Sequence, residues 1–364
     1  MPESRPVLCR TCMERLGIPD ADEGPCEICE KVRAGLHLAD TINPDFEYES
    51  FNVGIVMPPG PQEREGELVS AYHLRGARSF KTEMNRELRE RLEERLGKRA
   101  DVVDPDVVFE IHIPKGRVFY HLKSLTLSGS YNKYDRTIPQ TKWHCKACRG
   151  RGCPRCNNTG KMYPTSVEEI VGEPLLAATK GRETRFHGAG REDIDVRMLG
   201  DGRPFVIEIL SPKVRTLDYA ALEAAINEDE RIAIHGLAPC EKSLVEALKM
   251  GAFRKTYNAI LDKNLTIEEI KRIEEELVGE IDQRTPIRVS HRRSDLIRKR
   301  KVYKVIGKNS KTTELEIYCD GGLYIKELIS GDEGRTQPSV SQILNMQVQC
   351  KQLDVLAIHK DTDN

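Results

Sequence analysis

The chain has 364 residues, of which 38% are hydrophobic and 32% charged, and its formal net charge at pH 7 is −1. This length allows two domains, and the composition indicates a globular protein, because no apolar run approaches the length that a membrane span requires. No apolar stretch follows the first residues, so we expect no signal peptide and a cytoplasmic location, and the balanced charge leaves a nucleic-acid partner to be sought in local patches.

Residues 1–45 are expected to form a small zinc module. They hold few apolar side chains, so they are not expected to fold without a staple. Cys9, Cys12, Cys26 and Cys29 have the spacing of a four-thiolate site, in which two Cys-x-x-Cys pairs hold one tetrahedral zinc ion. In an intracellular chain this spacing favours a metal over disulfides.

Residues 46–164 are expected to form a second domain of strands and helices. The sequence predicts a strand over 51–56, a loop rich in proline and glycine up to residue 66, a charged helix over 82–96, and a hairpin with strands at 107–113 and 117–122.

A second cysteine cluster closes this domain, and its ligands are Cys145, Cys148, Cys153 and Cys156. Only four residues separate its two pairs, and glycines in the loop permit so tight a reversal. Because all ligands of both sites are thiolates, we expect structural zinc and no zinc-activated water. Pairing of cysteines across the two quartets stays open at this point.

From residue 165 to residue 364 strands and helices alternate and strands then dominate. Helices are predicted at 166–179, 217–226, 243–250 and 267–277, and strands at 204–210, 231–237 and through Tyr257, followed by four further strand-like stretches. Ser243 and Glu246 have the spacing of a capping box. This order of elements predicts an α+β fold around a mixed sheet.

Basic residues gather at two places with few acids beside them. One stretch holds Arg284, Arg288, Arg292, Arg293, Arg298, Lys299, Arg300, Lys301 and Lys304, and the second cysteine loop adds Lys146, Arg149, Arg151 and Arg155. A solvated charged face is the ordinary explanation of such a run. Because few acids balance the charge here, a phosphate backbone is the better interpretation.

Polar residues suited to catalysis occur in three segments of this second half. A glycine-rich turn carries Asp193 between Glu192 and Asp195, and an extended backbone would direct Asp193 and Asp195 to one side and Glu192 to the other. We expect this turn between helix 166–179 and strand 204–210. On its own, it is equally compatible with a polar surface turn.

The other two segments carry aromatic and basic side chains. Tyr257 offers a ring on which a base could stack. Tyr324 and Lys326 are two residues apart and are predicted to share one face of a strand, where the lysine would keep a neighbouring carboxylate ionised. Each segment alone is weak, and their joint order carries the information.

In this order, segments 190–200, 255–259 and 321–328 resemble the catalytic segments of pseudouridine synthases. From about residue 138 to residue 344 the chain resembles the archaeal and eukaryotic tRNA pseudouridine synthase family that modifies the TΨC arm. The similarity rests on G-R-E-D-x-D-V-R-x-L-G at 190–200, G-R-P-F at 202–205, and the segments 138–141, 283–289 and 334–339. The paired cysteines point to an archaeal member.

The resemblance implies a catalytic domain over 165–364, an RNA-binding N-terminal part that contains a THUMP domain, and uridines 54 and 55 of tRNA as targets. Asp193 would be the catalytic aspartate, attacking the ribose or the uracil. Tyr257 would stack on the flipped uracil and help to remove the C5 proton. Tyr324 would pack under the site, Lys326 would pair with Asp193, and Arg191 would help to hold the flipped nucleotide open.

Isomerisation neither adds nor removes atoms, so no organic cofactor is expected, and the chain shows no nucleotide-binding glycine loop. Three alternatives remain: a non-catalytic zinc protein that binds tRNA, a chaperone-like zinc module related to the C-x-x-C-x-G-x-G repeats of J-proteins, and an RNA methyltransferase with a THUMP-like N-terminal part.

Overall fold

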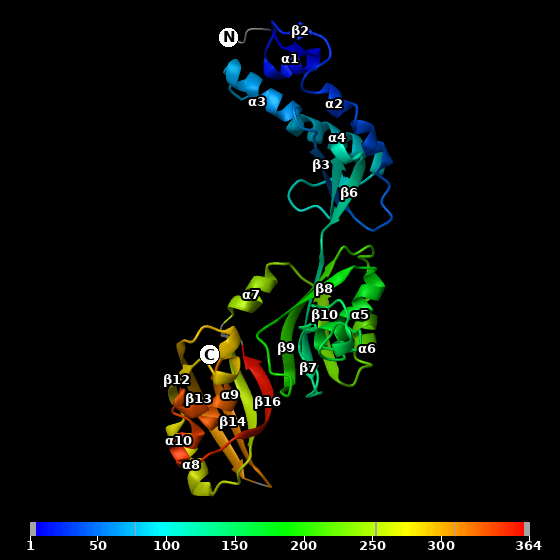
Figure 1. Ribbon diagram of the computed structural model, residues 1–364. Helices are drawn as coiled ribbons and strands as arrows, with labels where there is room; N and C mark the ends of the chain where they lie inside the picture. The colour runs from blue at the N-terminus through cyan, green and yellow to red at the C-terminus, as the bar shows by residue number, and fades with distance from the viewer. Residues whose placement is uncertain (1–4, 77, 252, 310, 360–364) are drawn as a thin grey trace. The chain divides into compact units, whose positions relative to one another are not determined.

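A computed structural model describes residues 5–76, 78–251, 253–309 and 311–359, which form two compact units (Figure 1). Unit 1 comprises residues 1–125 with the short segments 179–182 and 210–216, and unit 2 comprises 126–178, 183–209 and 217–364. Domain boundaries at 45 and 164 stay a prediction, because this division reflects compactness alone. Among the described residues, no helix is both long and apolar enough to cross a membrane.

Unit 1 is built on a four-stranded mixed sheet with the order β4-β3-β5-β6. β3 (Ser50–Val56) is parallel to β4 (Arg99–Ala100) and β5 (Val107–His112), and β6 (Arg117–Leu122) returns antiparallel to β5. The predicted strand, hairpin and helix are confirmed, the helix being α4 (Phe80–Leu96). The first residues form β1 (Val7–Leu8), α1 (Arg10–Leu16), β2 (Asp22–Glu23) and α2 (Glu30–Arg33).

The loop predicted up to residue 66 is wrong, because α3 (Pro61–Ala71) begins inside it. Proline is favoured at the first position of a helix, since its φ is already helical. The inward face of α3 holds Glu65 in place of an apolar residue, and this buried carboxylate accepts a 2.5 Å ion pair from Arg15 and a 2.8 Å hydrogen bond from the Phe80 N–H. A charged residue on the buried face removes the apolar periodicity that would have predicted the helix.

One hydrophobic core serves the whole of unit 1. It joins Leu8, Cys12 and Val32 of the first 45 residues to Phe51 of β3 and Leu88 of α4. The first cysteine cluster therefore braces the same core as the sheet.

Unit 2 contains a ten-stranded mixed sheet with the order β10-β7-β9-β16-β11-β14-β13-β12-β15, and β8 pairs with β9. The strands are β7 (Leu125–Lys133), β8 (Glu183–Gly188), β9 (Arg197–Leu210), β10 (Ile232–Pro239), β11 (Arg254–Leu261), β12 (Gly279–Arg284), β13 (Ile297–Asn309), β14 (Thr313–Asp320), β15 (Thr336–Gln337) and β16 (Cys350–His359). The mixed α+β class is confirmed. β9 and β16 are parallel, with the register pairs Arg197–Asp354 and Met198–Val355.

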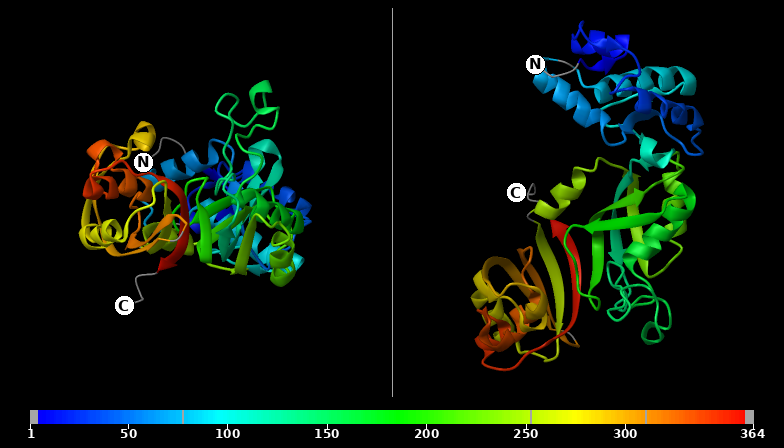
Figure 2. Two further views of the ribbon diagram at one scale, coloured as in Figure 1. Left: turned by 90° about the horizontal axis from the view of Figure 1, so that it is seen from below. Right: turned by 45° about the horizontal axis from the view of Figure 1, so that its top comes forward.

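Helices cover this sheet at several places (Figures 1 and 2). α5 (Val167–Thr179) packs against β8, α6 (Tyr219–Ile226) against β10, and α8 (Ile267–Glu276) against β13. The shorter helices are α7 (Leu244–Met250), α9 (Ile325–Ser330) and α10 (Val340–Leu344).

Two local expectations in unit 2 are wrong. Ser243 has helical φ/ψ angles and makes no capping hydrogen bond, so the predicted capping box does not form, whereas Thr266 and Glu269 form one at α8. Strand β9 includes the predicted strand 204–210 but already starts at residue 197. Gly200 and Gly202, which suggest a turn in the sequence, lie within the strand at φ of +60° and +80°. A Cβ on Gly202 would stand 2.9 Å from the Tyr131 backbone, so these glycines allow close strand approach.

Candidate active site

Asp193 lies on the loop 189–196 between β8 and β9, not between a helix and a strand as expected. The buried Lys133 on β7 donates to the carbonyl oxygens of Asp193 (3.4 Å) and Ile194 (2.7 Å), and Gln140 donates to the Gly190 carbonyl (3.0 Å). Burial lowers the pKa of Lys133. These bonds fix the loop backbone and leave its carboxylates free for other partners.

Glu192 turns into the interior, opposite to Asp193 and Asp195, as the alternation predicted. The Tyr131 hydroxyl lies 3.0 Å from both Glu192 oxygens, and Arg203 Nε lies 3.0 Å from Oε2, although not aligned for a hydrogen bond. Only 1% of either ionic side chain is exposed. Burial opposes the charge of Arg203, but Glu192 raises the pKa of Arg203 and keeps it charged.

Two cations approach Asp193. Arg288 Nη1 lies 3.0 Å from Oδ2 and 3.1 Å from Oδ1, whereas Lys326 Nζ lies 3.7 Å from Oδ2. Lys326 is closer to Asp195, at 2.7 and 2.8 Å. The expected ion pair between Lys326 and Asp193 is thus longer than the ion pair between Lys326 and Asp195. Buried Glu327 holds Arg288 at 2.5 Å, and this pair, against the opposing effect of burial, raises the pKa of Arg288.

Tyr324 and Lys326 do not share a strand, and that prediction is wrong. Tyr324 precedes α9, and Lys326 lies in its first turn. Gln283 bonds both backbone groups of Tyr324, accepting from its N–H at 2.8 Å and donating to its carbonyl at 3.0 Å. Gly322, at φ +85°, ends the strand that the alternation seemed to continue.

Tyr257 lies on β11 and is 8% exposed. It lines a cavity of about 300 Å³, and burial raises the pKa of its hydroxyl above the ordinary value. All five residues singled out from the sequence line this cavity, namely Arg191, Asp193, Tyr257, Tyr324 and Lys326. The arrangement places a carboxylate, two cations and two aromatic rings around a space suited to a planar base.

Trp143 lies at the outer side of this region. The Arg191 guanidinium is 4.9 Å from the centre of its ring, and both residues line a cavity of about 550 Å³ with Asp193. Trp143 precedes Cys145 by two residues. The second cysteine cluster therefore follows, in the sequence, a residue that shares a cavity with Asp193.

Several residues that build the site were given no catalytic or positioning role from the sequence, namely Tyr131, Lys133, Arg203, Lys255 and Glu327, together with Arg288, which was predicted only as part of the basic stretch. Arg203 and Arg288 stand in segments quoted for the family resemblance, so a signal existed for them. Lys255 and Glu327 lie in such segments as well, at 255–259 and 321–328. Lys133 resembled an ordinary polar position, because its partners Asp193 and Ile194 are distant in sequence.

Each cysteine quartet comes together by itself. In both clusters the four sulfur atoms lie within 4.8 Å of one another, and the sulfur distances include 3.5 Å for Cys9–Cys29 and 3.7 Å for Cys153–Cys156. Thiolates at about 2.3 Å from a tetrahedral ion stand about 3.8 Å apart, so both sets fit a metal such as zinc.

The basic stretch divides by strand alternation on β13. Arg298 and Arg300 line the cavity beside Asp193, while Lys299 points away and pairs with Glu280 at 2.5 Å. Arg284 pairs with Asp295, and the side chain of Arg292 lies outside the described part. In the second cysteine loop, Lys146, Arg149, Arg151 and Arg155 are exposed.

Comparison with known proteins gives consistent matches. Residues 126–359 match the family model "Pus10, C-terminal", and residues 38–112 match "Pus10 THUMP domain, archaeal". The chain is 47% identical to the tRNA pseudouridine synthase Pus10 of Methanocaldococcus jannaschii, covering 91% of this chain and 73% of that protein. It is 39% identical to the Pus10 of Methanothrix thermoacetophila, covering 98% and 82%. A Cbf5-Nop10-Gar1 complex matches at 19% identity over 54% of this chain and 46% of that chain, with a TM-score of 0.33.

Proposed function

The chain belongs to the archaeal Pus10 family of tRNA pseudouridine synthases, and from this premise we propose that it isomerises uridines 54 and 55 in the TΨC arm of tRNA with Asp193 as the catalytic residue. The enzyme is an isomerase. The observation that carries the proposal is the single cavity in which Asp193, two cations and Tyr257 meet.

The reaction needs the target base outside its stack, because the atoms to be exchanged are inaccessible in a folded arm. Arg288 and Lys326 pair with the Asp193 carboxylate and orient it, and it attacks the ribose or the uracil as the glycosidic bond breaks. The freed uracil rotates and forms a bond from C5 to the ribose, and the bond to Asp193 breaks, either as C5 displaces the carboxylate from the ribose or as the adduct of the carboxylate with the base is released. C5 then loses its proton and N1 takes one up. Atoms balance without a cofactor.

Tyr257 supplies a platform on which the flipped uracil stacks, and this recovers part of the cost of extruding it. Burial raises the pKa of Tyr257, so its hydroxyl stays protonated, which favours stacking over removal of the C5 proton. Arg191 holds the flipped nucleotide open from the Trp143 side, and Tyr324 packs beneath the base.

The two cysteine clusters hold one structural zinc ion each, and all ligand positions are filled by thiolates. The THUMP domain in unit 1 and the exposed basic residues of the second cysteine loop bind the tRNA backbone. A cytoplasmic location remains part of the same proposal.

Tritium release from tRNA that carries 5-tritiated uridine tests the assignment of Asp193. Wild type is expected to release tritium, Asp193→Asn to release none while still binding tRNA, and the matched variant Asp195→Asn to keep measurable release. Loss in Asp195→Asn alone would transfer the catalytic role to that residue. No release by folded wild type on several tRNAs would favour a non-catalytic tRNA-binding protein.

A further inference from the structure

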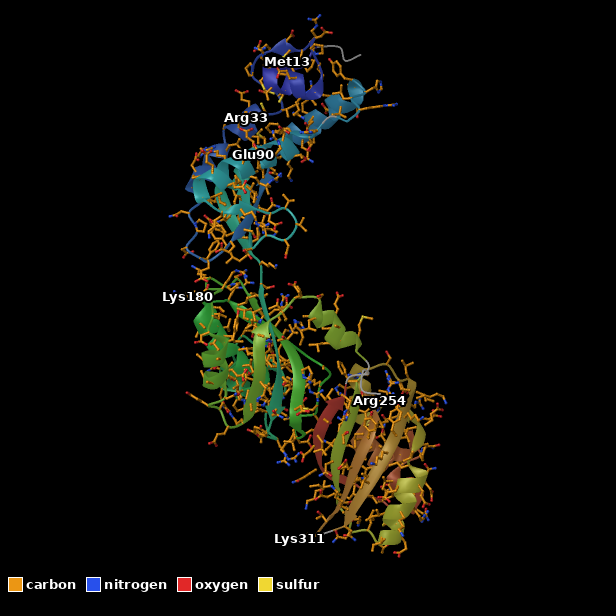
Figure 3. The ribbon with its side chains drawn as sticks, turned by 180° about the vertical axis from the view of Figure 1, so that it is seen from behind. Met13, Arg33, Glu90, Lys180, Arg254 and Lys311 are labelled. Atoms are coloured by element: carbon orange, nitrogen blue, oxygen red, sulfur yellow. The ribbon has the colours of Figure 1, made fainter. Side chains whose placement is uncertain are left out.

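A further cavity adjoins the cavity of about 300 Å³ that Asp193 and Tyr257 line. Its volume is about 480 Å³, and the two cavities share Gly190, Lys255, Arg300 and Gly322. The cavity lies at the start of β11, where Arg254, labelled in Figure 3, is one of its lining residues. The proposed function gives this cavity no role.

Lys255 is the unusual residue at the boundary of the two cavities. It lies two residues before Tyr257 on β11, so both side chains share a face. Only 8% of the residue is exposed, and within the described ranges its ammonium forms no hydrogen bond or ion pair, although the charge of Glu192 acts on it. Burying a charged lysine without an ion-pair partner costs free energy. An anionic group of a bound ligand would supply that partner.

The surroundings of Lys255 add positive charge. Lys255 Nζ and Arg203 Nη1 lie 3.0 and 3.3 Å from the point where a Cβ on Gly190 would stand. Gly190 has φ +80°, so a side chain there would be strained as well as crowded against both cations. Among the described residues, Glu192 forms an ion pair with Arg203 and none with Lys255.

Arg300 faces the same space from β13. Its Nε is buried and has no hydrogen-bond partner among the described residues. Asp320 is the one acid that lines the cavity in the described part, and its oxygens are engaged by the Tyr303 hydroxyl and the Lys301 N–H, each at 2.8 Å. In the described part, no carboxylate that lines this cavity forms an ion pair with Lys255 or Arg300.

We propose that Lys255 and Arg300 form a subsite for a phosphodiester that flanks the target uridine. RNA carries one anionic phosphate per nucleotide, and a base seated beside Tyr257 brings its own flanking phosphates to the adjoining cavity. The subsite holds the backbone while the base is out of its stack. This inference rests on the proposed function, because it takes the cavity beside Tyr257 as the uracil site.

Phosphate-ethylation interference tests the subsite. A TΨC-arm RNA carrying random ethyl phosphotriesters is divided into bound and free fractions with wild type, Lys255→Met and the matched control Lys271→Met, in which an exposed lysine of α8 that lines neither cavity is replaced. For wild type and the control, we expect exclusion of a triester at a phosphate flanking the target. Lys255→Met is expected to lose that exclusion and keep the others.

A salt titration of RNA affinity at pH 6.5 supplies a second measurement. Loss of one phosphate contact lowers the slope of log affinity against log salt by about 0.7–0.9, which a merely structural lysine would not do. The inference is overturned if neither flanking phosphate shows interference in wild type, or if Lys255→Met shows an unchanged pattern and slope. Failure of the proposed function is separate, since wild type would then form no pseudouridine on the unmodified RNA.

Discussion

Arg288 is the closer of the two cations at Asp193, because its Nη1 lies 3.0 Å from Oδ2 whereas Lys326 Nζ lies 3.7 Å from the same atom. Arg288 is in turn fixed by the buried carboxylate of Glu327 at 2.5 Å. Arg288 therefore orients Asp193, whereas the shorter ion pair of Lys326 is the one with Asp195.

Arg288→Gln is expected to lower kcat by about 10-fold to 100-fold, since a hydrogen bond to a charged group contributes about 1.5–3 kcal/mol. Single-turnover formation of pseudouridine measures the effect, and Arg288→Lys should recover part of the rate by restoring the charge. Arg284→Gln is the matched control, because Arg284 is exposed and pairs with Asp295 away from the cavity. Equal loss of kcat in both variants would contradict a specific role for Arg288.

The buried Glu192–Arg203 pair predicts a stability effect. Glu192→Gln leaves Arg203 as an uncompensated buried charge, so the free energy of unfolding should fall by about 3–5 kcal/mol. Urea unfolding followed by circular dichroism measures this change. Asp201 is exposed on β9, the strand that carries Arg203, and Asp201→Asn should change the free energy of unfolding by less than about 0.5 kcal/mol. A loss below about 1 kcal/mol in Glu192→Gln would contradict the prediction.

Local patterns in the sequence predicted most of the elements near the site, such as β11 through Tyr257 and the amphipathic α8, whose Ile270 and Ile273 are buried. Motif order also identified five residues that line one cavity. What could not be predicted depends on contacts distant in sequence. Arg288 meets Asp193 across 95 positions, and no short-range pattern encodes that pairing. Tyr324 was misplaced because alternation continues past Gly322, where the backbone turns.

The sulfur geometry of both quartets predicts two zinc ions per chain. Elemental analysis of the purified wild type should give a value near two, and the double variant Cys153→Ser with Cys156→Ser should give a value near one. The remaining ion belongs to the first cluster, which braces the core of unit 1, so its removal by a chelator should unfold that unit. A value of one or less in wild type would contradict the two-site prediction.

The buried position of Lys255 predicts how the free energy of unfolding depends on pH. Burial and the charge of Arg203 lower the pKa of Lys255 to about 7 from the ordinary value of 10.5. Between these two values the unfolded chain binds the proton that the folded chain has released, so the free energy of unfolding rises with pH across this window. Burial raises the pKa of Cys319, which pairs with Lys255 across the strands, from 9.0 to about 12. Above pH 9 this thiol lowers the free energy of unfolding as pH rises, and the comparison of wild type with Lys255→Met largely cancels this contribution.

Lys255→Met removes this titration. The variant should be more stable than wild type at pH 7, and the difference should shrink by at most about 1.4 kcal/mol for each unit of rising pH. Urea unfolding at pH 7, 8.5 and 10 measures it, with Lys271→Met as the exposed control that should follow wild type. Parallel pH profiles for wild type and Lys255→Met would show that the lysine is charged in the folded protein. A bound phosphate would favour the charged lysine again, so saturating TΨC-arm RNA should flatten the wild-type profile.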